Sequence, residues 1–212
     1  EDATHIRRIT VGRLLGGTPA VFVASAVNNS AIVTDVFAWR NDRFSNISYS
    51  RDSDTSVQTL RNYYVYAEDI DGDGVMELPS LITMKRVFPE QEGKQKFLIR
   101  WFAMDLEGRE MDKFFTFHNY LGGWYMQLAS SWAPRVSVEQ EGGKYTFYVW
   151  DEDYRQALDV FSIYVLTGGS REEDATVDGR FAFYRAEGVV YAAKLEANAA
   201  EFGITENQLI NS

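Results

Sequence analysis

The sequence of 212 residues contains no cysteine. This absence excludes disulfide bonds, thiolate metal sites and cysteine nucleophiles. Histidine is scarce as well, because His5 and His118 are the only two and lie far apart in the sequence. A metal site or a general base that depends on several imidazoles is therefore not expected.

Positive charge and long apolar segments are also scarce. The chain has 21 Lys and Arg against 31 Asp and Glu, which gives a net charge of −10. A nucleic-acid partner is not expected, since it would need a basic face, and an anionic membrane surface would repel the chain. No apolar run approaches the roughly 18 residues of a transmembrane helix. We expect an export signal upstream of Glu1, where a lipid anchor could also be attached, and an extracellular or cell-envelope location.

What the sequence has in abundance is aromatic residues, which make up 15% of the chain and favour sheets over helical bundles. Their alternation with polar residues predicts eight strands in two groups of four within residues 1–118. The first group covers residues 5–11, 20–27, 31–39 and 44–49, and the second covers 63–67, 78–84, 97–104 and 111–117. A repeat of about 55 to 65 residues with four strands per unit is typical of propeller blades.

One stretch has a specific chemical signature. Asp69, Asp71 and Asp73 alternate with other residues, two glycines allow the backbone to turn, and Glu77 follows before an apolar strand. Carboxylate and carbonyl oxygens are the ligands that Ca²⁺ prefers, and the carbonyl of Val75 could supply one more. A helical calcium hand is disfavoured, because its twelfth position is Ser80 rather than glutamate. The alternative is an acidic, glycine-rich turn without a metal.

The spacing D-x-D-x-D-G-x-x-E between two strands resembles the calcium loops of integrin-type FG-GAP repeats and their VCBS-like bacterial relatives. The resemblance implies a structural calcium site whose ligands are Asp69, Asp71, Asp73, Val75 and Glu77. It is specific for this loop and weaker for the rest of residues 1–118. The turn at residues 12–21 aligns with the loop but carries no carboxylates, so we expect it to fold without a metal.

Residues 119–212 have a different pattern and predict a small α+β domain. Hairpins are expected at residues 135–150 and 180–195, and two capping boxes predict short helices that begin after Ser170 and Thr205. The pattern of residues 124–128, 145–150 and 161–166 faintly resembles PsbP-like α/β sandwich domains. That resemblance implies a binding or scaffold module without a shared catalytic set. The predicted fold class is therefore α+β and mostly antiparallel β, with blade-like four-stranded sheets followed by a small sandwich domain.

No set of residues predicts an active site. Asp151, Glu152 and Asp153 are adjacent in a polar turn, which is typical of a solvated loop rather than a catalytic acid–base pair. We therefore expect a non-enzymatic, exported bacterial cell-surface or lipoprotein module for binding or adhesion, with an unidentified protein or glycan as ligand. The alternative is a carbohydrate-binding accessory domain whose aromatic residues form a platform for sugar rings. The candidates for that platform are Trp124, Tyr125, Trp132, Tyr148, Trp150 and Tyr154.

Overall fold

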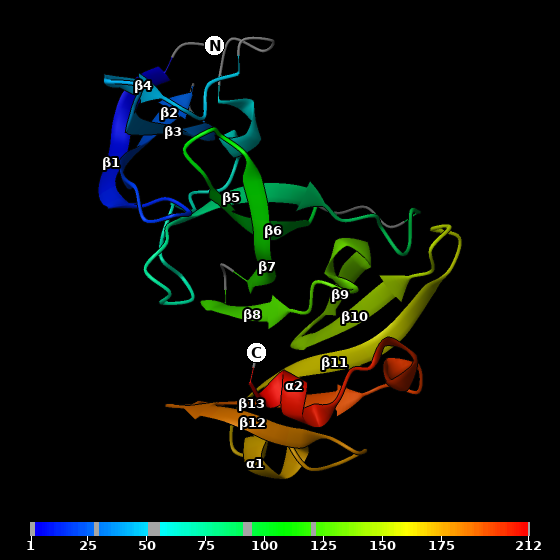
Figure 1. Cartoon of the computed structure of the whole chain (residues 1–212). Helices are drawn as coiled ribbons and strands as arrows, with labels where there is room; N and C mark the ends of the chain where they lie inside the picture. Colours follow the sequence, from blue (N-terminus) through cyan, green and yellow to red (C-terminus); the bar gives the residue numbers. More distant parts are fainter. Residues whose placement is uncertain (1–2, 28–29, 51–55, 91–94, 120–121, 212) are drawn as a thin grey trace. The chain divides into compact units, whose positions relative to one another are not determined.

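The computed structural model describes residues 3–27, 30–50, 56–90, 95–119 and 122–211 (Figure 1). The chain divides into two compact units. The first comprises Glu1–Ile82 and Ile99–His118, and the second comprises Thr83–Leu98 and Asn119–Ser212. Residues 83–98, which the sequence pattern groups with the N-terminal half, therefore belong to the second unit. No helix in the described part of the chain is long and apolar enough to cross a membrane.

In the described part of the chain the strands form three sheets, which are mostly antiparallel. The prediction of a mostly antiparallel β fold with four-stranded sheets and few helices is confirmed. The first sheet has the order β1-β2-β3-β4. Its strands are β1 (Ala3–Arg13), β2 (Pro19–Val27), β3 (Ala31–Arg40) and β4 (Arg43–Asn46).

The second sheet has the order β5-β6-β7-β8. Its strands are β5 (Glu77–Thr83), β6 (Phe97–Met104), β7 (Glu110–Asn119) and β8 (Trp124–Leu128). The strand predicted at residues 63–67 is not formed, and β8 is the fourth strand in its place. The guanidinium of Arg61 donates hydrogen bonds of 2.6 Å to the carbonyls of Thr59 and Val65, which holds this segment in an irregular path.

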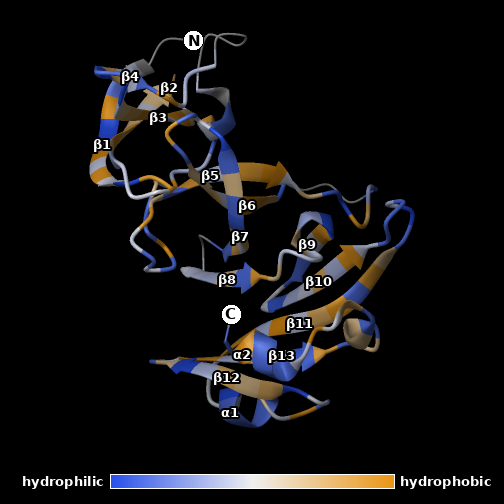
Figure 2. Ribbon diagram, in the orientation of Figure 1, coloured by the Kyte–Doolittle hydropathy of each residue, from blue (hydrophilic) through white to orange (hydrophobic). Residues whose placement is uncertain are grey.

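The core of the first unit lies between the inner face of the first sheet and one face of β5 and β6. Phe22, Val36 and Ala38 from the first sheet belong to the same buried cluster as Leu78 and Phe102. In β6 both Trp101 and its neighbour Phe102 are almost fully buried, so the strand is covered on both faces. The sequence of residues 97–104 is largely apolar on both faces, as this central position requires. Figure 2 shows the apolar character of these strands.

The second unit contains a five-stranded sheet with the order β12-β13-β11-β10-β9. Both predicted hairpins are present in it. Its strands are β9 (Val136–Glu141), β10 (Lys144–Trp150), β11 (Ala157–Thr167), β12 (Phe181–Ala186) and β13 (Val189–Leu195).

The helices are short. They are α1 (Arg171–Asp174), α2 (Glu206–Ile210) and the 3₁₀ turns Val57–Thr59, Ala133–Arg135 and Ala199–Phe202. The capping box predicted at Thr205 is formed with Gln208. The one predicted at Ser170 is wrong, because the Ser170 hydroxyl donates to Asp174 instead of capping the helix. Helix α1 is a single turn that ends at Asp174.

Candidate metal site and aromatic pocket

The acidic loop is closed by an isolated antiparallel bridge between Glu68 and Glu77, the first residue of β5. The two main-chain hydrogen bonds of this bridge measure 3.1 and 2.9 Å. Within the loop Gly72 and Gly74 have φ angles of 74° and 86°, a region that favours glycine. The predicted glycine turn between two carboxylate groups is therefore present.

The three aspartates organise the loop through main-chain hydrogen bonds. Asp71 Oδ1 accepts from the N–H of Asp73 at 3.2 Å, and Asp73 Oδ1 accepts from the N–H of Val75 at 2.8 Å. Asp69 Oδ2 accepts from the N–H of Gly74 at 3.0 Å. Each aspartate keeps a second carboxylate oxygen that these bonds do not use. One oxygen of each aspartate therefore holds the loop in shape.

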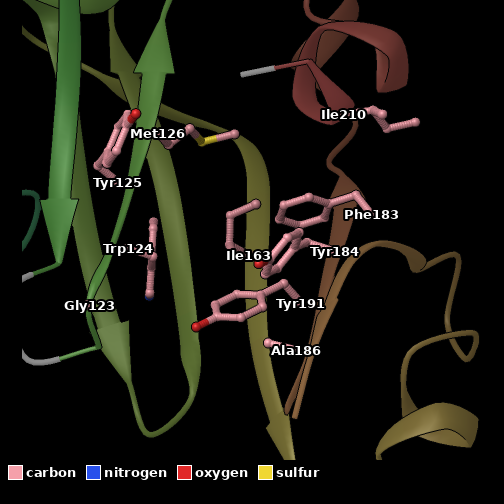
Figure 3. Close-up of a pocket in the computed structure, with 10 residues that line it drawn as sticks. All are labelled: Gly123, Trp124, Tyr125, Met126, Ile163, Phe183, Tyr184, Ala186, Tyr191 and Ile210. Carbon is pink, nitrogen blue, oxygen red and sulfur yellow. The ribbon is translucent and has the colours of Figure 1, made fainter. Parts of the chain in front are cut away.

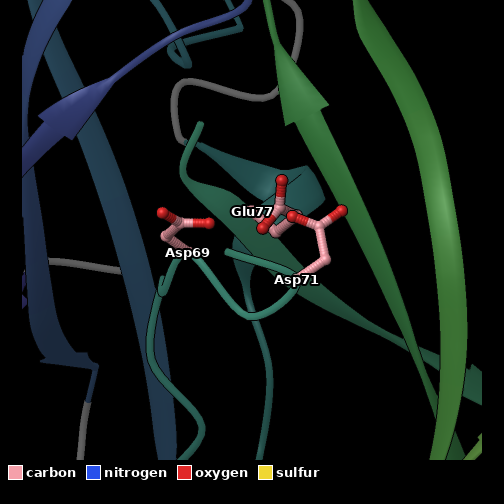
Figure 4. A group of neighbouring side chains, drawn as sticks. All are labelled: Asp69, Asp71 and Glu77. Carbon is pink, nitrogen blue, oxygen red and sulfur yellow. The ribbon is translucent and has the colours of Figure 1, made fainter. Parts of the chain in front are cut away.

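Three of the four predicted carboxylates lie together. Asp69, Asp71 and Glu77 each offer an oxygen, and these oxygens lie within 4.8 Å of one another. Figure 4 shows the three side chains turned toward a common point. Glu77 is fully buried, and neither its Oε1 nor Asp69 Oδ1 accepts a hydrogen bond from the described residues. Buried carboxylate oxygens without a donor are costly, and a bound cation would satisfy them.

Burial has a clear electrostatic consequence at Glu77. It raises the pKa of this carboxyl from 4.5 to about 7, and the nearby charges of Asp71 and Asp73 contribute in the same direction. The N–H of Ile70, which donates to Oε2 at 3.2 Å, and the charge of Lys113 act against this rise. Near neutral pH the Glu77 carboxyl is therefore only partly ionised, and a nearby cation favours its ionised form.

Asp73, the fourth predicted carboxylate, is engaged by a lysine from β7. Lys113 Nζ donates to Asp73 Oδ2 and lies 3.6 Å from Asp71 and 3.8 Å from Glu77. The hydrogen bond from Lys113 lowers the pKa of Asp73, and the same bond raises the pKa of Lys113. The lysine is therefore a cation already present at the edge of the cluster, and no motif in the sequence marks it.

The donor chemistry of the cluster fits a hard cation. Asp69, Asp71 and Glu77 supply only oxygen atoms from one short loop, and such ligands suit Ca²⁺, Mg²⁺ or Mn²⁺. The cluster could therefore hold a metal ion. Of the remaining predicted ligands, Asp73 pairs with Lys113, and Val75 is held by its N–H on Asp73.

The acid-free turn at residues 12–21 is closed by different means. The N–H of Leu14 donates to the carbonyl of Thr18 at 2.9 Å, and Arg13 donates to the carbonyl of Gly17 at 3.0 Å. Leu14 is fully buried in the core. Main-chain hydrogen bonds and an apolar anchor thus do here what carboxylates do in the acidic loop.

The residues considered for catalysis have structural partners. Asp151 accepts main-chain hydrogen bonds from Arg155 and Gln156 at 2.7 and 3.2 Å, and Asp153 lies 3.7 Å from Arg155. His118 Nε2 lies 2.9 Å from the hydroxyl of Thr116, and burial lowers the pKa of His118 to about 4. These contacts are those of turns and of a partly buried strand residue.

The six aromatic residues considered for a sugar platform do not form one surface. Trp132 and Trp150 are buried, and the ammonium of Lys85 lies 3.9 Å from the centre of the Trp150 ring. Tyr154 is exposed and lies on the loop that precedes β11. Of the six, Trp124 and Tyr125 line the pocket described next.

This pocket, called here the aromatic pocket, lies in the second unit and has a volume of about 600 Å³. Figure 3 shows that its walls come from β8 and its preceding turn, from β11, from the β12–β13 hairpin and from α2. The lining residues are Gly123, Trp124, Tyr125, Met126, Ile163, Phe183, Tyr184, Ala186, Tyr191 and Ile210. Phe183, Tyr184 and Tyr191 lie in the predicted hairpin of residues 180–195, and no motif in the sequence marks them as site residues.

Comparisons of the chain with protein-family models, with curated proteins and with solved structures return no match.

Proposed function

We propose that this chain is a non-enzymatic binding or adhesion module of an exported bacterial cell-surface protein or lipoprotein, with a structural Ca²⁺ in the acidic loop. The observation that carries the calcium part is the fully buried Glu77, which clusters with Asp69 and Asp71 and whose Oε1 has no hydrogen-bond donor among the described residues. A carboxylate in this position is destabilising unless a cation balances its charge.

Calcium is favoured over magnesium by the kind of ligand available. Ca²⁺ accepts about six to eight oxygens in a flexible arrangement, including main-chain carbonyls, whereas Mg²⁺ needs a near-ideal octahedron. Asp69, Asp71 and Glu77 supply three oxygens, and Asp73, the Val75 carbonyl and water would complete the shell. The resemblance of the loop to FG-GAP calcium loops supports the same assignment.

A structural role is favoured because the ligands come from one turn. Asp69 and Glu77 flank the loop that the Glu68–Glu77 bridge closes, so a bound ion would clamp the start of β5. A catalytic ion would need a nucleophile and a proton carrier within reach. Among the described residues, the group beside the cluster that could carry a proton is Lys113, and its ammonium is paired with Asp73.

The proposed export is supported by composition. A chain without cysteine and with a net charge of −10 is compatible with an extracellular setting. Extracellular calcium modules bind the ion with dissociation constants on the order of 10⁻⁴ to 10⁻³ M. A weak site of this kind therefore suits an extracellular setting. In that setting the ion would stiffen a module whose ligand-binding surface lies elsewhere on the chain.

The test is a thermal-unfolding series with the metal removed by chelator and then restored. Ca²⁺ at millimolar concentration is expected to raise the Tm, and Asp69→Asn combined with Asp71→Asn is expected to abolish that rise. Asp105→Asn is a matched control, because Asp105 also accepts main-chain hydrogen bonds in a turn but is paired with Arg109. A Tm that is the same with calcium and with chelator would exclude the site.

A further inference from the structure

We propose that the aromatic pocket of the second unit binds a short, uncharged saccharide. This rests on the proposed function, because it names the ligand class of the binding module. Pockets of about 300 to 1,000 Å³ that are mostly apolar and carry a few polar groups are typical ligand sites. At about 600 Å³ the aromatic pocket falls within that range.

A β-bulge gives the pocket two consecutive aromatic residues. The pairing of β12 with β13 shifts between Ala182 and Tyr184, so that Phe183 is the additional residue of the bulge. In a regular strand successive side chains point to opposite faces, whereas a bulge redirects one of them. Phe183 and Tyr184 accordingly both line the pocket. Bulges of this kind are common beside functional sites.

Tyr191 is at the centre of the aromatic wall. Its ring centre lies 5.8 Å from that of Tyr184, 6.4 Å from that of Phe183 and 6.3 Å from that of Trp124. Trp124 is held in turn by an edge-on contact with Tyr145 at 5.2 Å. Figure 3 shows the Tyr191 side chain directed toward Trp124. Aromatic rings fixed by one another lose little conformational entropy when a ligand binds.

The absence of charge restricts the ligand. None of the ten described residues that line the pocket is Asp, Glu, Lys, Arg or His, although charged residues make up 25% of the chain. A charged ligand would lose its hydration in this pocket without gaining a counter-charge. The ligand is therefore uncharged.

The phenol groups favour a saccharide. Tyr125 and Tyr184 are each 58% exposed, so their rings and hydroxyls are accessible to a ligand. A pyranose ring has one face of C–H groups that can lie on an aromatic ring, and hydroxyls at its edge that can bond to phenols. Tyrosine offers both kinds of contact in one side chain.

Two other uncharged occupants fit less well. An acyl chain makes no hydrogen bonds, so it would offer nothing to the exposed phenol groups of Tyr125 and Tyr184. A proline-rich peptide docks on aromatic grooves through donors that reach its carbonyls. The indole Nε1 of Trp124 is buried, so only tyrosine hydroxyls of the lining could donate to the carbonyls of such a peptide.

The experiment is a binding titration of the whole chain in calcium-containing buffer, measured by calorimetry and by tryptophan fluorescence. The probes are cellotetraose, xylotetraose, maltotetraose and N-acetylated chitotetraose, together with an array of neutral glycans. At least one is expected to bind, and Tyr184→Ala is expected to weaken that binding at least tenfold. Tyr184 is exposed, so its replacement leaves the fold intact. Tyr64→Ala, an exposed tyrosine of the first unit, is the matched control and is expected to leave the affinity unchanged.

Three results would overturn the proposal. One is the absence of binding by every neutral glycan at millimolar concentration. Another is binding that Tyr184→Ala does not weaken, and the third is binding of a fatty acid or a proline-rich peptide that this substitution abolishes while no glycan binds. The calcium-dependent Tm of the same samples separates this proposal from the calcium site. A calcium-stabilised protein without glycan binding would contradict the ligand class alone, whereas glycan binding without calcium stabilisation would contradict the calcium site alone.

Discussion

The ammonium of Lys113 lies 3.8 Å from Oε1 of Glu77, a buried carboxylate oxygen that accepts no hydrogen bond from the described residues. The same ammonium is bonded to Asp73 and lies 3.6 Å from Asp71. A lysine thus partly balances the loop in the absence of a metal, but it does not satisfy the innermost carboxylate. A divalent cation and Lys113 would compete for the same carboxylates.

Replacement of Lys113 by methionine tests this competition. In chelator the variant is expected to melt about 3–6 °C below the unsubstituted protein, because the acidic loop loses its only nearby ammonium among the described residues. Its affinity for Ca²⁺ is expected to rise several-fold, since Asp73 is released. Both quantities are measured by calcium titration of the Tm.

Arg109→Met is the control for Lys113→Met. Arg109 also forms ion pairs with two carboxylates, but it is 77% exposed and pairs with Asp105 and Glu107 outside the acidic loop. Its calcium response is expected to match that of the unsubstituted protein. Weaker calcium binding by Lys113→Met would instead mean that the lysine positions the loop for the metal.

Part of the site follows from the sequence and part does not. The alternation of Asp69, Asp71 and Asp73 predicts the loop because the ligands are local, and local spacing determines which oxygens converge. Lys113 reaches the loop from a strand far along the chain, so only the sheet register brings it there. The inward position of Phe183 likewise depends on a bulge, which breaks the two-residue period on which sequence reasoning relies.

The fold likewise has features that the sequence predicts and features that depend on tertiary contacts. Alternating apolar residues predict most of the strands. Residues 97–104 instead form a nearly continuous apolar run, which indicates burial on both faces and a central strand. The segment 63–67 has the composition of a strand, but Arg61 binds the carbonyl of Val65 and withdraws it from pairing. A hydrogen bond of this kind cannot be inferred from composition.

The affinity for calcium is expected to depend on pH through Glu77. The pKa of this carboxyl is about 7 in the metal-free fold, and a metal ligand must be ionised, so protons compete with the ion below pH 7. The apparent Kd for Ca²⁺ is expected to rise by about tenfold per pH unit as the pH falls from 7 to 5. Calorimetric titrations at pH 5.5, 6.5 and 7.5 measure it. An affinity that is constant over this range would contradict the role of Glu77 as a ligand.

In the absence of metal, ionisation of Glu77 is expected to make the folded protein less stable as the pH rises, whereas calcium affinity increases with pH. Because the folded-state pKa of Glu77 lies above its ordinary value of 4.5, the folded protein binds more protons between pH 4.5 and 7. The free energy of unfolding in chelator is therefore expected to decrease as the pH rises through this window. Glu77→Gln, which stays uncharged, is expected to remove this slope in urea-denaturation curves.

His118 is expected to contribute a slope in the other direction. Burial lowers the pKa of its imidazole from 6.5 to about 4, so the unfolded chain binds the proton more readily between these values. The stabilisation is present above pH 6.5 and is lost as the pH falls toward 4. His118→Gln is expected to flatten this part of the stability curve. An imidazole that titrates near pH 6.5 in NMR spectra of the folded protein would contradict the prediction.

The capping box at Thr205 and the uncapped helix start at Ser170 provide a matched pair for the second unit. Thr205 Oγ1 accepts from the N–H of Gln208 at 3.4 Å, and Gln208 Oε1 accepts from the N–H of Thr205 at 2.9 Å. Thr205→Ala is therefore expected to cost about 1 kcal/mol in the free energy of unfolding, because α2 also holds the buried Leu209 in place. Ser170→Ala is expected to cost only a few tenths of that, since the Ser170 hydroxyl donates to the side chain of Asp174 at the protein surface and caps no main-chain N–H. Urea denaturation of both variants measures the difference. Equal losses would mean that the cap at Thr205 contributes nothing beyond an exposed side-chain contact.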